Sequence, residues 1–442
     1  MRSSIFHAVV FLGIVSTLRS AESRHWPQFR GPGSRGVAEG EGFPSEWDTN
    51  RNVRWSVEMP GAGWSGPIVW NDQILLTTVV SEGAPETPKK GLYFGGERRA
   101  AAPGRHQWMV YCLNWSDGKV AWKKELHAGE PSNPLHVKNT YASETPCTDG
   151  ERVYAYFGNV GLFCLDLKGK ELWSRKWPSV KTRNGWGSAA SPVVHGDRVY
   201  VVNDNESKSF IVALNKLTGE EIWRVDRDEP SNWATPYVWQ NATRTEIVTP
   251  GRNKVRSYDL DGKVLWELSG MSSIVIPTPF SVFDLVYVCS GYVGDSLRPA
   301  YAIRPGATGD ITLKDGQTNA FVAWSDKTAA PYNPSPIVYG DYFYVLFDFG
   351  FLSCHDARTG RLVYEKQRID PKGNVAFTTS PWAADGKIFC LSEDGDTYVF
   401  KAGPKYELLR KNSLTEMCMA TPAVVDKSFI IRTYSRIYRI AN

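Results

Sequence analysis

Short apolar runs separated by polar turns recur along the whole chain. Each unit begins with a small residue, a proline, two apolar residues, a polar turn and a second apolar run, as in ASPVVHGDRVYVVND (residues 190–204). It ends with a further apolar run, an Asn or Asp, a glycine turn and an aromatic residue, as in IVALNKLTGEEIW (residues 211–223). Because apolar runs bounded by turn-forming residues are typical of β-strands, each unit predicts four short antiparallel strands.

The unit recurs eight times. Its leading prolines follow one another about every 51 residues, at Pro67, Pro146, Pro192, Pro236, Pro279, Pro336, Pro381 and Pro422. The closing aromatic residues keep the same spacing, at Trp122, Trp173, Trp223, Trp266, Trp324 and Tyr364. Four-stranded units at a fixed period are the blades of a propeller. We therefore expect an all-β fold, an eight-bladed β-propeller of four-stranded antiparallel blades, with the closing tryptophans packed between neighbouring blades.

The two ends of the chain complement each other. The eighth unit stops at Asn442 after three predicted strands, and a further predicted strand, residues 52–57, precedes the first unit. If this strand completes the last blade, the ring closes and leaves no free sheet edge. The sequence thus predicts a single propeller domain over residues 24–442.

Residues 1–23 have the features of a secretory signal peptide. Arg2 precedes an apolar run from Ile5 to Val15, and mostly polar residues follow, with the small residues Ala21 and Ser23 just before the expected cleavage site. This run has 11 residues, fewer than the roughly 18 needed to span a bilayer. We expect cleavage before Arg24 and export of a soluble chain, without a membrane span, to the periplasm or the medium. The alternative is a short membrane anchor.

Composition excludes several classes of function. With 51 Lys and Arg against 47 Asp and Glu, and no dense basic run, nucleic-acid binding is not expected. The seven cysteines stand singly in apolar runs and form no Cys-x-x-Cys motif, which excludes zinc ribbons and thioredoxin-type sites. We expect them to be buried free thiols in strands.

The closing part of the repeat resembles that of a known family. ALNKLTGEEIW (residues 213–223) and its variant CLNWSDGKVAW (residues 112–122) resemble the tryptophan-docking repeat of pyrroloquinoline-quinone (PQQ) propellers. WPQFRGP (residues 26–32) further resembles exported bacterial PQQ-like propeller proteins. The resemblance implies the propeller fold and either of two functions. Quinoprotein dehydrogenases hold PQQ and Ca²⁺ on the axis, whereas the outer-membrane assembly propeller binds protein partners.

Two departures from the dehydrogenases determine the leading hypothesis. The chain has no adjacent cysteines and lacks their large insertions. We therefore expect a monomeric, exported, non-catalytic binding or scaffold module of the cell envelope, with a protein partner or a small polar ligand on its axial face. The alternatives are a PQQ- and Ca²⁺-dependent dehydrogenase of alcohols or sugars, and a propeller that recognises carbohydrate through aromatic residues.

In a propeller, the blade-to-blade connections and the turns between second and third strands share one face. If a quinone binds there, the expected cofactor-binding residues are Trp64, Trp186, Trp233, Arg252 and Glu206. Asp295 would then be the catalytic base, and the candidate Ca²⁺ ligands are Glu144, Asn232 and Asp348. The structural alternatives are that the tryptophans fill the channel rim and that residues 204–206 form a solvated hairpin tip.

The largest departure from the period is an insertion in the first unit, residues 81–107. It is basic and rich in Gly and Pro, and it falls on the face of the candidate site. We expect it to cover a ligand or to present a docking surface, with a mobile solvent loop as the alternative.

Overall fold

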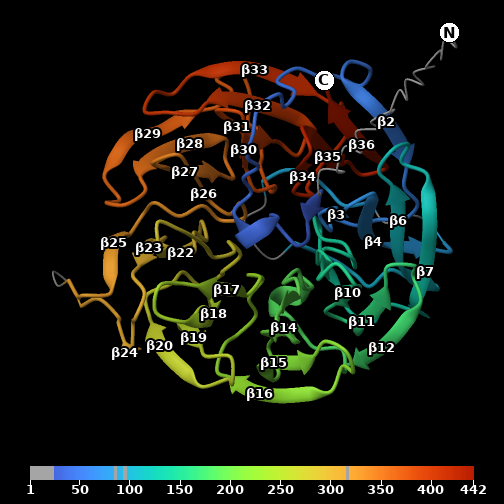
Figure 1. Cartoon of the computed structure of the whole chain (residues 1–442), viewed down its shortest axis with the longest axis horizontal. Helices are drawn as coiled ribbons and strands as arrows, with labels where there is room; N and C mark the ends of the chain where they lie inside the picture. The colour runs from blue at the N-terminus through green and yellow to red at the C-terminus, as the bar shows by residue number, and fades with distance from the viewer. Residues whose placement is uncertain (1–23, 84–86, 93–96, 315–317) are drawn as a thin grey trace, which may run out of the picture.

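The computed structural model describes residues 24–83, 87–92, 97–314 and 318–442. Its strands form eight sheets arranged as blades around one axis (Figure 1). Two 3-10 turns, η1 (Pro32–Ser34) and η2 (Arg183–Gly185), are the helical elements of the described residues. The predicted fold class is therefore confirmed. No helix in this part of the chain has the length and apolar character needed to cross a membrane, and the predicted signal peptide lies outside it.

Blades 1 to 4 follow the repeat in chain order. In pairing order, their strands are β1 (His25–Trp26), β3 (Ile68–Trp70), β4 (Gln73–Ser81), β6 (His106–Asn114) and β7 (Val120–Gly129) in blade 1; β9 (Cys147–Thr148), β10 (Arg152–Phe157), β11 (Gly161–Asp166) and β12 (Glu171–Lys176) in blade 2; β13 (Val193–His195), β14 (Arg198–Asn203), β15 (Ser209–Asn215) and β16 (Glu221–Arg227) in blade 3; and β17 (Tyr237–Gln240), β18 (Thr245–Thr249), β19 (Val255–Tyr258), β20 (Val264–Leu268) and β24 (Gly309–Asp310) in blade 4.

Blades 5 to 8 complete the ring. Their strands are β21 (Phe280–Val282), β22 (Leu285–Cys289), β23 (Ala300–Ile303) and β25 (Val322–Asp326) in blade 5; β26 (Ile337–Tyr339), β27 (Tyr342–Phe347), β28 (Phe351–Asp356) and β29 (Leu362–Arg368) in blade 6; β30 (Trp382–Ala384), β31 (Lys387–Leu391), β32 (Asp396–Lys401) and β33 (Leu408–Ser413) in blade 7; and β34 (Ala423–Val425), β35 (Ser428–Arg432), β36 (Arg436–Ala441) and β2 (Val53–Glu58) in blade 8. A separate ribbon pairs β5 (Arg98–Arg99) with β8 (Leu135–His136).

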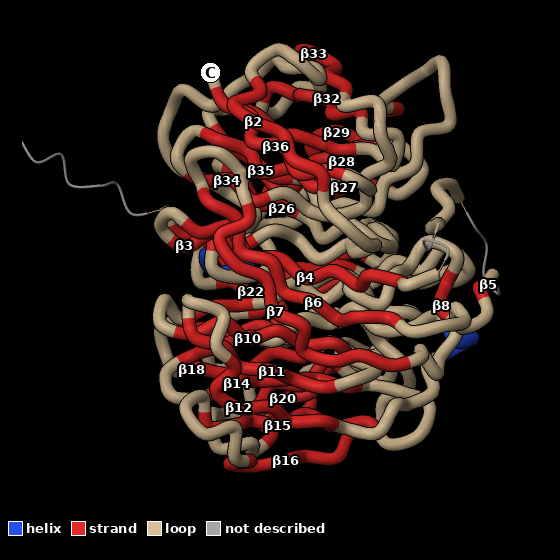
Figure 2. Tube along the Cα trace, turned by 90° about the vertical axis from the view of Figure 1, so that its right-hand side faces the viewer, coloured by secondary structure: helices blue, strands red, loops and turns tan. Residues whose placement is uncertain are grey.

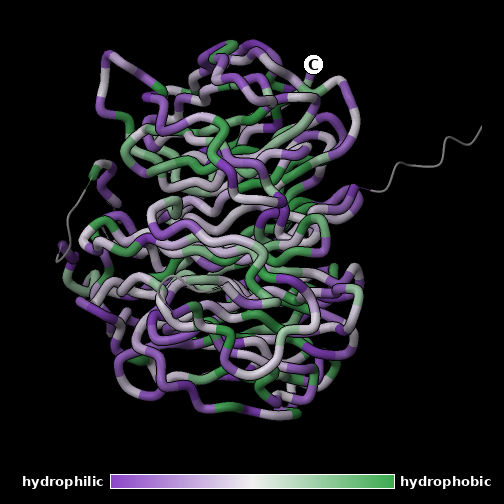
Figure 3. Tube along the Cα trace, turned by 90° about the vertical axis from the view of Figure 1, so that its left-hand side faces the viewer, coloured by the Kyte–Doolittle hydropathy of each residue, from purple (hydrophilic) through white to green (hydrophobic). Residues whose placement is uncertain are grey.

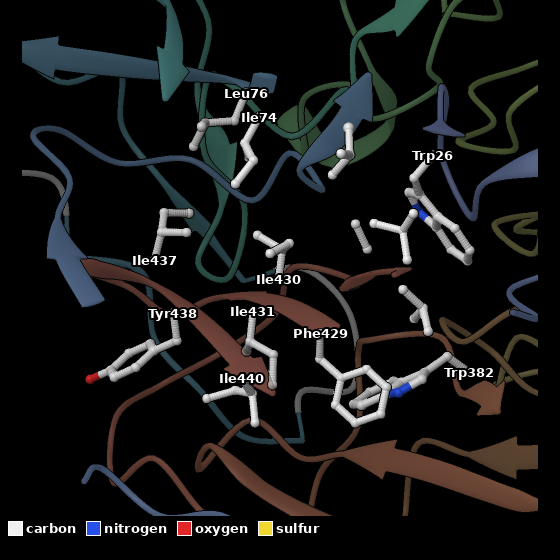
Figure 4. Packing of buried hydrophobic residues seen from close by; sticks show 14 of the residues in the cluster. Trp26, Ile74, Leu76, Trp382, Phe429, Ile430, Ile431, Ile437, Tyr438 and Ile440 are labelled. Atoms are coloured by element: carbon white, nitrogen blue, oxygen red, sulfur yellow. The ribbon is translucent and has the colours of Figure 1, made fainter. Parts of the chain in front are cut away.

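The ring closes as the sequence predicts, because β2 pairs antiparallel with β36 and completes blade 8. The N-terminal segment and the C-terminal strands share one hydrophobic core with blades 1 and 7 (Figure 4). In it, the ring of Trp382 stacks on Phe389 at 5.4 Å and meets Phe429 edge-on at 5.6 Å. Burial of each such ring stabilises the fold by about 1.5–3 kcal/mol, so this core holds the two chain ends together.

The closing tryptophans lie between neighbouring blades, as expected. In five of them, the indole N–H donates to a backbone carbonyl in the last turn of the following blade, at 2.7–3.1 Å. The pairs are Trp55 with Trp115, Trp122 with Leu167, Trp173 with Lys216, Trp223 with Leu260, and Trp324 with Ala357. The ring also covers the glycine of that turn, and a Cβ on Gly169 would lie 2.6 Å from Trp122. The glycine is therefore required both by its backbone conformation and by this contact.

Trp266 of blade 4 departs from this pattern. Its N–H donates to the buried carboxylate of Glu246 in the same blade at 2.7 Å. The next blade carries an insertion in its last turn, and this insertion supplies β24, which pairs with β20 beside Trp266. The extra strand takes the place of the glycine turn on which the other tryptophans pack.

A ring of hydroxyl groups surrounds the axis. In blades 2 to 8, the residue before the leading proline is Ser or Thr. Its hydroxyl oxygen accepts a hydrogen bond from the backbone N–H of the residue at the same position in the preceding blade. This bond is present in six of the eight junctions, at 2.9–3.1 Å. Blade 1 has Gly66 at this position. There the junction with blade 8 contains Arg432, whose guanidinium donates to Ser65 and to the carbonyl of Thr77.

The N-terminal segment crosses one end of the axial channel (Figure 1, blue). Pro27 accepts from Thr148 of blade 2, Arg30 donates to the carbonyl of Pro336 before blade 6, and Gly36 accepts from Ala383 of blade 7. Residues 27–36 therefore contact opposite sides of the ring and block this end, and we call them the plug. The sequence did not predict it, because a short non-periodic loop carries no signal of its distant contacts.

The opposite face carries the insertion. In Figure 2, β5 and β8 lie at the right-hand edge, whereas β3 lies towards the left. Hydrophobic residues concentrate in the stacked strands, and hydrophilic residues in the loops at the two faces (Figure 3). All seven cysteines are buried and unpaired, as expected.

Candidate axial binding site

An axial cavity of about 210 Å³ lies between the blades, bordered by the hydroxyl ring. Every blade or its connection contributes to the wall. From the hydroxyl ring come Ser191, Thr235, Thr278, Ser335, Ser380 and Thr421. Aromatic walls are formed by Phe29 of the plug and by Trp64, Trp186, Trp233, Tyr332 and Phe349. Further polar residues around the cavity are His136, Lys138, Asn139, Ser143, Asn333, Asp348 and Thr378.

The three tryptophans are held in different ways. Trp64 donates its indole N–H to the carbonyl of Lys138, and Trp233 donates to that of Gly187, both at 2.8 Å. Trp186 packs against Trp233 with ring centroids 5.9 Å apart at 43°. Its own Nε1 is buried, and among the described residues it has no hydrogen-bond acceptor.

Asp348 is fully buried at the turn between β27 and β28. Its carboxylate accepts the backbone N–H groups of Tyr332 and Asn333 at 2.9 and 3.0 Å, and the side-chain amide of Asn333 at 2.5 Å. Burial raises the pKa of Asp348 to about 6, although these backbone hydrogen bonds oppose the shift. The carboxylate is thus occupied in fixing the connection to blade 6, and it is a weakly acidic group at the cavity wall.

Glu393 ties the insertion to both sides of the cavity mouth. One carboxylate oxygen accepts from Lys138 Nζ at 2.5 Å and from the Thr378 hydroxyl at 2.6 Å, and the other accepts the Gly91 N–H at 2.7 Å. The neighbouring Lys89 N–H donates to Val137 before blade 2 at 2.8 Å. Residues 89–92 therefore extend from blade 2 to blade 7, and Leu92 lines the cavity. We call residues 89–92 the cover segment.

The sequence-predicted residues separate into two groups. Trp64, Trp186, Trp233 and Asp348 line the axial cavity. Arg252 and Glu206 are exposed and do not line it, and Glu206 accepts the N–H of Ser231. Asp295 is also outside the lining, where its carboxylate accepts both the backbone N–H and the hydroxyl of Ser273.

Glu144 and Asn232 lie further out, between blades. Buried Glu144 accepts from Gly158 and from the Ser188 hydroxyl, and burial raises its pKa. Asn232 donates to Asp204, whose carboxylate forms a two-point ion pair with Arg227; both side chains of that pair are 0% exposed. Asp204 is therefore a buried structural group, not part of a solvated hairpin tip.

Sequence reasoning missed several cavity residues, among them His136, Lys138, Tyr332, Phe29 and Leu92. Burial and the charges of Lys138 and Arg99 lower the pKa of His136 to about 4, so its imidazole is neutral at pH 7. The hydroxyl ring did leave a signal, because a Ser or Thr precedes seven of the eight leading prolines. Lys138 and Tyr332 lie in connections between blades, but their residue types alone did not distinguish them from other loop residues.

The described residues do not fit a calcium-held quinone. Calcium takes six to eight oxygen ligands, yet the carboxylates of Asp348 and Glu393 are already bound by protein donors, and no three His, Cys, Asp or Glu of the described residues are grouped to hold a metal ion. Among the described residues of the lining, Lys138 is the one cationic side chain, and it is paired with Glu393. The cavity of about 210 Å³ is also smaller than the usual ligand site of about 300–1,000 Å³.

Comparisons with known proteins agree on the fold. The chain is similar to the structure of BamB from Moraxella catarrhalis, at 13% identity over 87% of this chain and 98% of that one, with a TM-score of 0.57. It is also similar to a europium-containing methanol dehydrogenase (13% identity, 92% and 88% covered, TM-score 0.59) and to the quinohemoprotein alcohol dehydrogenase of Comamonas testosteroni (11%, 94% and 80%, 0.58). At such identities these likenesses establish the fold alone.

No curated protein gives a match to the chain. The family model described as outer membrane protein assembly factor BamB matches residues 49–206, 106–294 and 207–440. These segments together extend over nearly the whole propeller. The chain therefore belongs to this family of PQQ-like propellers, whose fold is shared by BamB and by quinoprotein dehydrogenases.

Proposed function

We propose that the protein is an exported, non-catalytic binding module of the cell envelope that docks a protein partner on its axial face. The observation that carries the proposal is the size and lining of the axial cavity. A pocket of about 210 Å³ with aromatic walls suits one anchoring side chain of a partner, because interface energy concentrates where such an anchor fills a desolvated pocket.

The surface around the mouth supports docking. Lys89, Lys90 and Arg98 of the insertion are exposed there, while Glu393 fixes the cover segment beneath them. A partly polar, charged border around an apolar centre is the usual anatomy of a protein interface. Export rests on the signal-peptide features of residues 1–23, and we propose that the chain acts as a monomer.

Site-specific photocrosslinking in cells tests the proposal. A photoreactive residue replaces Lys90 at the mouth or, as a control, exposed Leu217 at a turn of blade 3. We expect one defined adduct from position 90 in the envelope fraction, and none from position 217. Adducts from position 217 alone, or from neither position, would contradict axial docking.

A second assay separates this function from catalysis. The purified protein is supplied with PQQ, Ca²⁺ and an artificial electron acceptor, and is tested on alcohols and aldoses. Because the axial residues bind one another instead of forming a cofactor site, we expect no dye reduction above the rate without protein. Turnover would overturn the non-catalytic assignment.

A further inference from the structure

We propose that the axial face recognises an acidic segment of its protein partner, in which an apolar side chain enters the cavity and flanking aspartate or glutamate residues pair with cationic side chains at the mouth. The inference rests on the proposed function, since it specifies the chemistry of the partner that docks there. Three features lead to it: the apolar lining of the cavity, cationic side chains at the mouth without a carboxylate partner, and carboxylates that are already bound.

The lining of the cavity favours an apolar anchor. Beside the aromatic walls it contains Leu92, Ala189, Ile276, Val293 and Met419. Burial of an apolar side chain among such groups is favourable in itself, whereas a charged group would lose its water there. An acidic residue of the partner therefore stays outside the cavity, where it meets the charged side chains around the mouth.

A two-stranded ribbon and a 3-10 turn position two arginines beside the mouth. Arg98 of β5 pairs in register with His136 of β8, which lies in the cavity lining. The His136 N–H donates to the Trp186 carbonyl at 3.2 Å, so η2, which contains Arg183, lies against the same ribbon. The backbone thus fixes the positions of both arginines.

Half-buried Arg183 extends along the edge of the cavity. Its Nη1 donates to the Ser273 carbonyl, in the connection between blades 4 and 5, at 2.9 Å. Burial and the charge of Asp348 raise the pKa of Tyr332, and the charge of Arg183 opposes that shift, so Arg183 lies near this residue of the lining. A guanidinium has five N–H donors, and a carbonyl takes up one of them without neutralising the charge. Arg183 therefore has donors left for a carboxylate.

Lys89 is the third cationic side chain at the mouth. It is exposed in the cover segment, and its backbone N–H donates to Val137 at 2.8 Å. Among the described residues, no carboxylate forms an ion pair with Lys89, with exposed Arg98 or with Arg183. We call these three side chains the rim cations.

The carboxylates around the mouth offer less to a partner. They already accept hydrogen bonds or ion pairs from protein groups, at Glu206, Asp295, Asp348, Glu393 and Asp394. Glu97, which precedes Arg98, has one carboxylate oxygen buried. A cationic residue of a partner would have to compete with the bound donors, whereas an anionic residue finds the rim cations unpaired. Complementary charge of this kind selects a partner and fixes its register.

The first test is a titration of the purified protein with three capped pentapeptides: Glu-Glu-Leu-Glu-Glu, Lys-Lys-Leu-Lys-Lys and Glu-Glu-Gly-Glu-Glu. We expect the first to bind at one site per chain and at least about tenfold more tightly than either of the others, because it alone combines an apolar anchor with negative charge. Raising the salt concentration from about 50 to about 500 mM should weaken its binding by about threefold or more, since salt screens exposed charges.

Charge variants test the rim cations. Arg98→Glu/Arg183→Glu should weaken the acidic leucine peptide at least about tenfold and remove the photocrosslinked adduct at position 90 in cells. The matched control, Lys168→Glu/Lys263→Glu, makes the same change of charge at exposed turns of blades 2 and 4 on the opposite face, and should leave both unchanged. If the double rim variant folds poorly, Lys89→Glu at an exposed position tests the same rim, with an expected loss of about threefold.

A filling variant locates the anchor. Ala189 lines the cavity, so Ala189→Phe should abolish binding of the acidic leucine peptide while the thermal unfolding midpoint stays within a few degrees of wild type. Tighter binding of the lysine peptide, equal binding of the leucine and glycine peptides, binding that survives Ala189→Phe, or no binding of any peptide would each overturn the inference.

The inference and the proposed function fail in different ways. If an adduct forms at position 90 and persists in the folded Arg98→Glu/Arg183→Glu variant, the acidic segment is wrong and axial docking stands. If the acidic leucine peptide binds as expected and no adduct forms at position 90, recognition of an acidic segment stands and docking of a cellular partner at this face is wrong.

Discussion

At the scale of single residues, Asp348 should leave a signature in the pH dependence of stability. Its pKa in the folded chain is about 6, above the ordinary 3.8, because the carboxyl group is buried. Between these values the folded chain keeps a proton that the unfolded chain has lost. The contribution of Asp348 to the free energy of unfolding is therefore greatest below pH 4. It falls as the pH rises to about 6 and stays constant above that.

The measurement is urea unfolding of wild type and Asp348→Asn at several pH values. We expect the free energy of unfolding of wild type, relative to the variant, to fall by about 3 kcal/mol between pH 4 and pH 7, since two pKa units correspond to this amount. Parallel pH curves for the two proteins would show that Asp348 titrates normally.

The sequence predicted only some of the residues that line the axial cavity. Trp64, Trp186, Trp233 and Asp348 were nominated from their places in the repeat and line the cavity, although their role in binding stays a prediction. Arg252 was nominated by the same reasoning and points to solvent. The repeat fixes which loop a residue occupies, but the direction of its side chain depends on neighbouring blades that the pattern does not describe.

At the scale of elements, the turns before the fourth strands carry the contact between blades. Gly219 has φ 72°, and a Cβ there would lie 2.5 Å from the ring of Trp173. Gly196 has φ 59° and no atom within 4 Å of its Cβ position. Gly196→Ala should cost about 1 kcal/mol for the left-handed conformation alone, and Gly219→Ala about 3 kcal/mol because it also displaces the ring. Chemical denaturation measures both, and equal losses would disprove the docking role of the turn.

The cover segment depends on one carboxylate. Glu393→Gln leaves one acceptor oxygen for three donors and removes the charge opposite Lys138. We expect amide exchange at Gly91 to accelerate at least tenfold. Asp394→Asn is the matched control, because Asp394 pairs with exposed Lys90 at the surface, and should change that rate less than threefold. Similar rates in both variants would mean that Glu393 does not hold the segment.

The elements themselves were largely predictable. Leading prolines, polar turns and closing tryptophans are local patterns, so they identified the blades and the closing strand β2. The plug, β1 and β24 were missed because each is short and is stabilised by contacts distant in sequence, such as the pairing of Trp26 with Val69.

At the scale of the whole molecule, a closed ring leaves one cavity-bearing face and one blocked face. The plug closes the channel from one side, and the cover segment crosses the other. The axial cavity of about 210 Å³ lies between them, and Phe29 of the plug and Leu92 of the cover segment both belong to its lining. The same fold serves BamB and the quinoprotein dehydrogenases, so the contents of the cavity and not the fold distinguish the functions.

The most direct measurement is a calorimetric titration of PQQ into the purified protein, with and without Ca²⁺. The account predicts no saturable heat in either case, because the carboxylates of Asp348 and Glu393 are already bound by protein donors and Lys138 is paired with Glu393. Saturable, Ca²⁺-dependent binding, abolished by Ala189→Phe, would contradict it and identify the axial site as a quinone site.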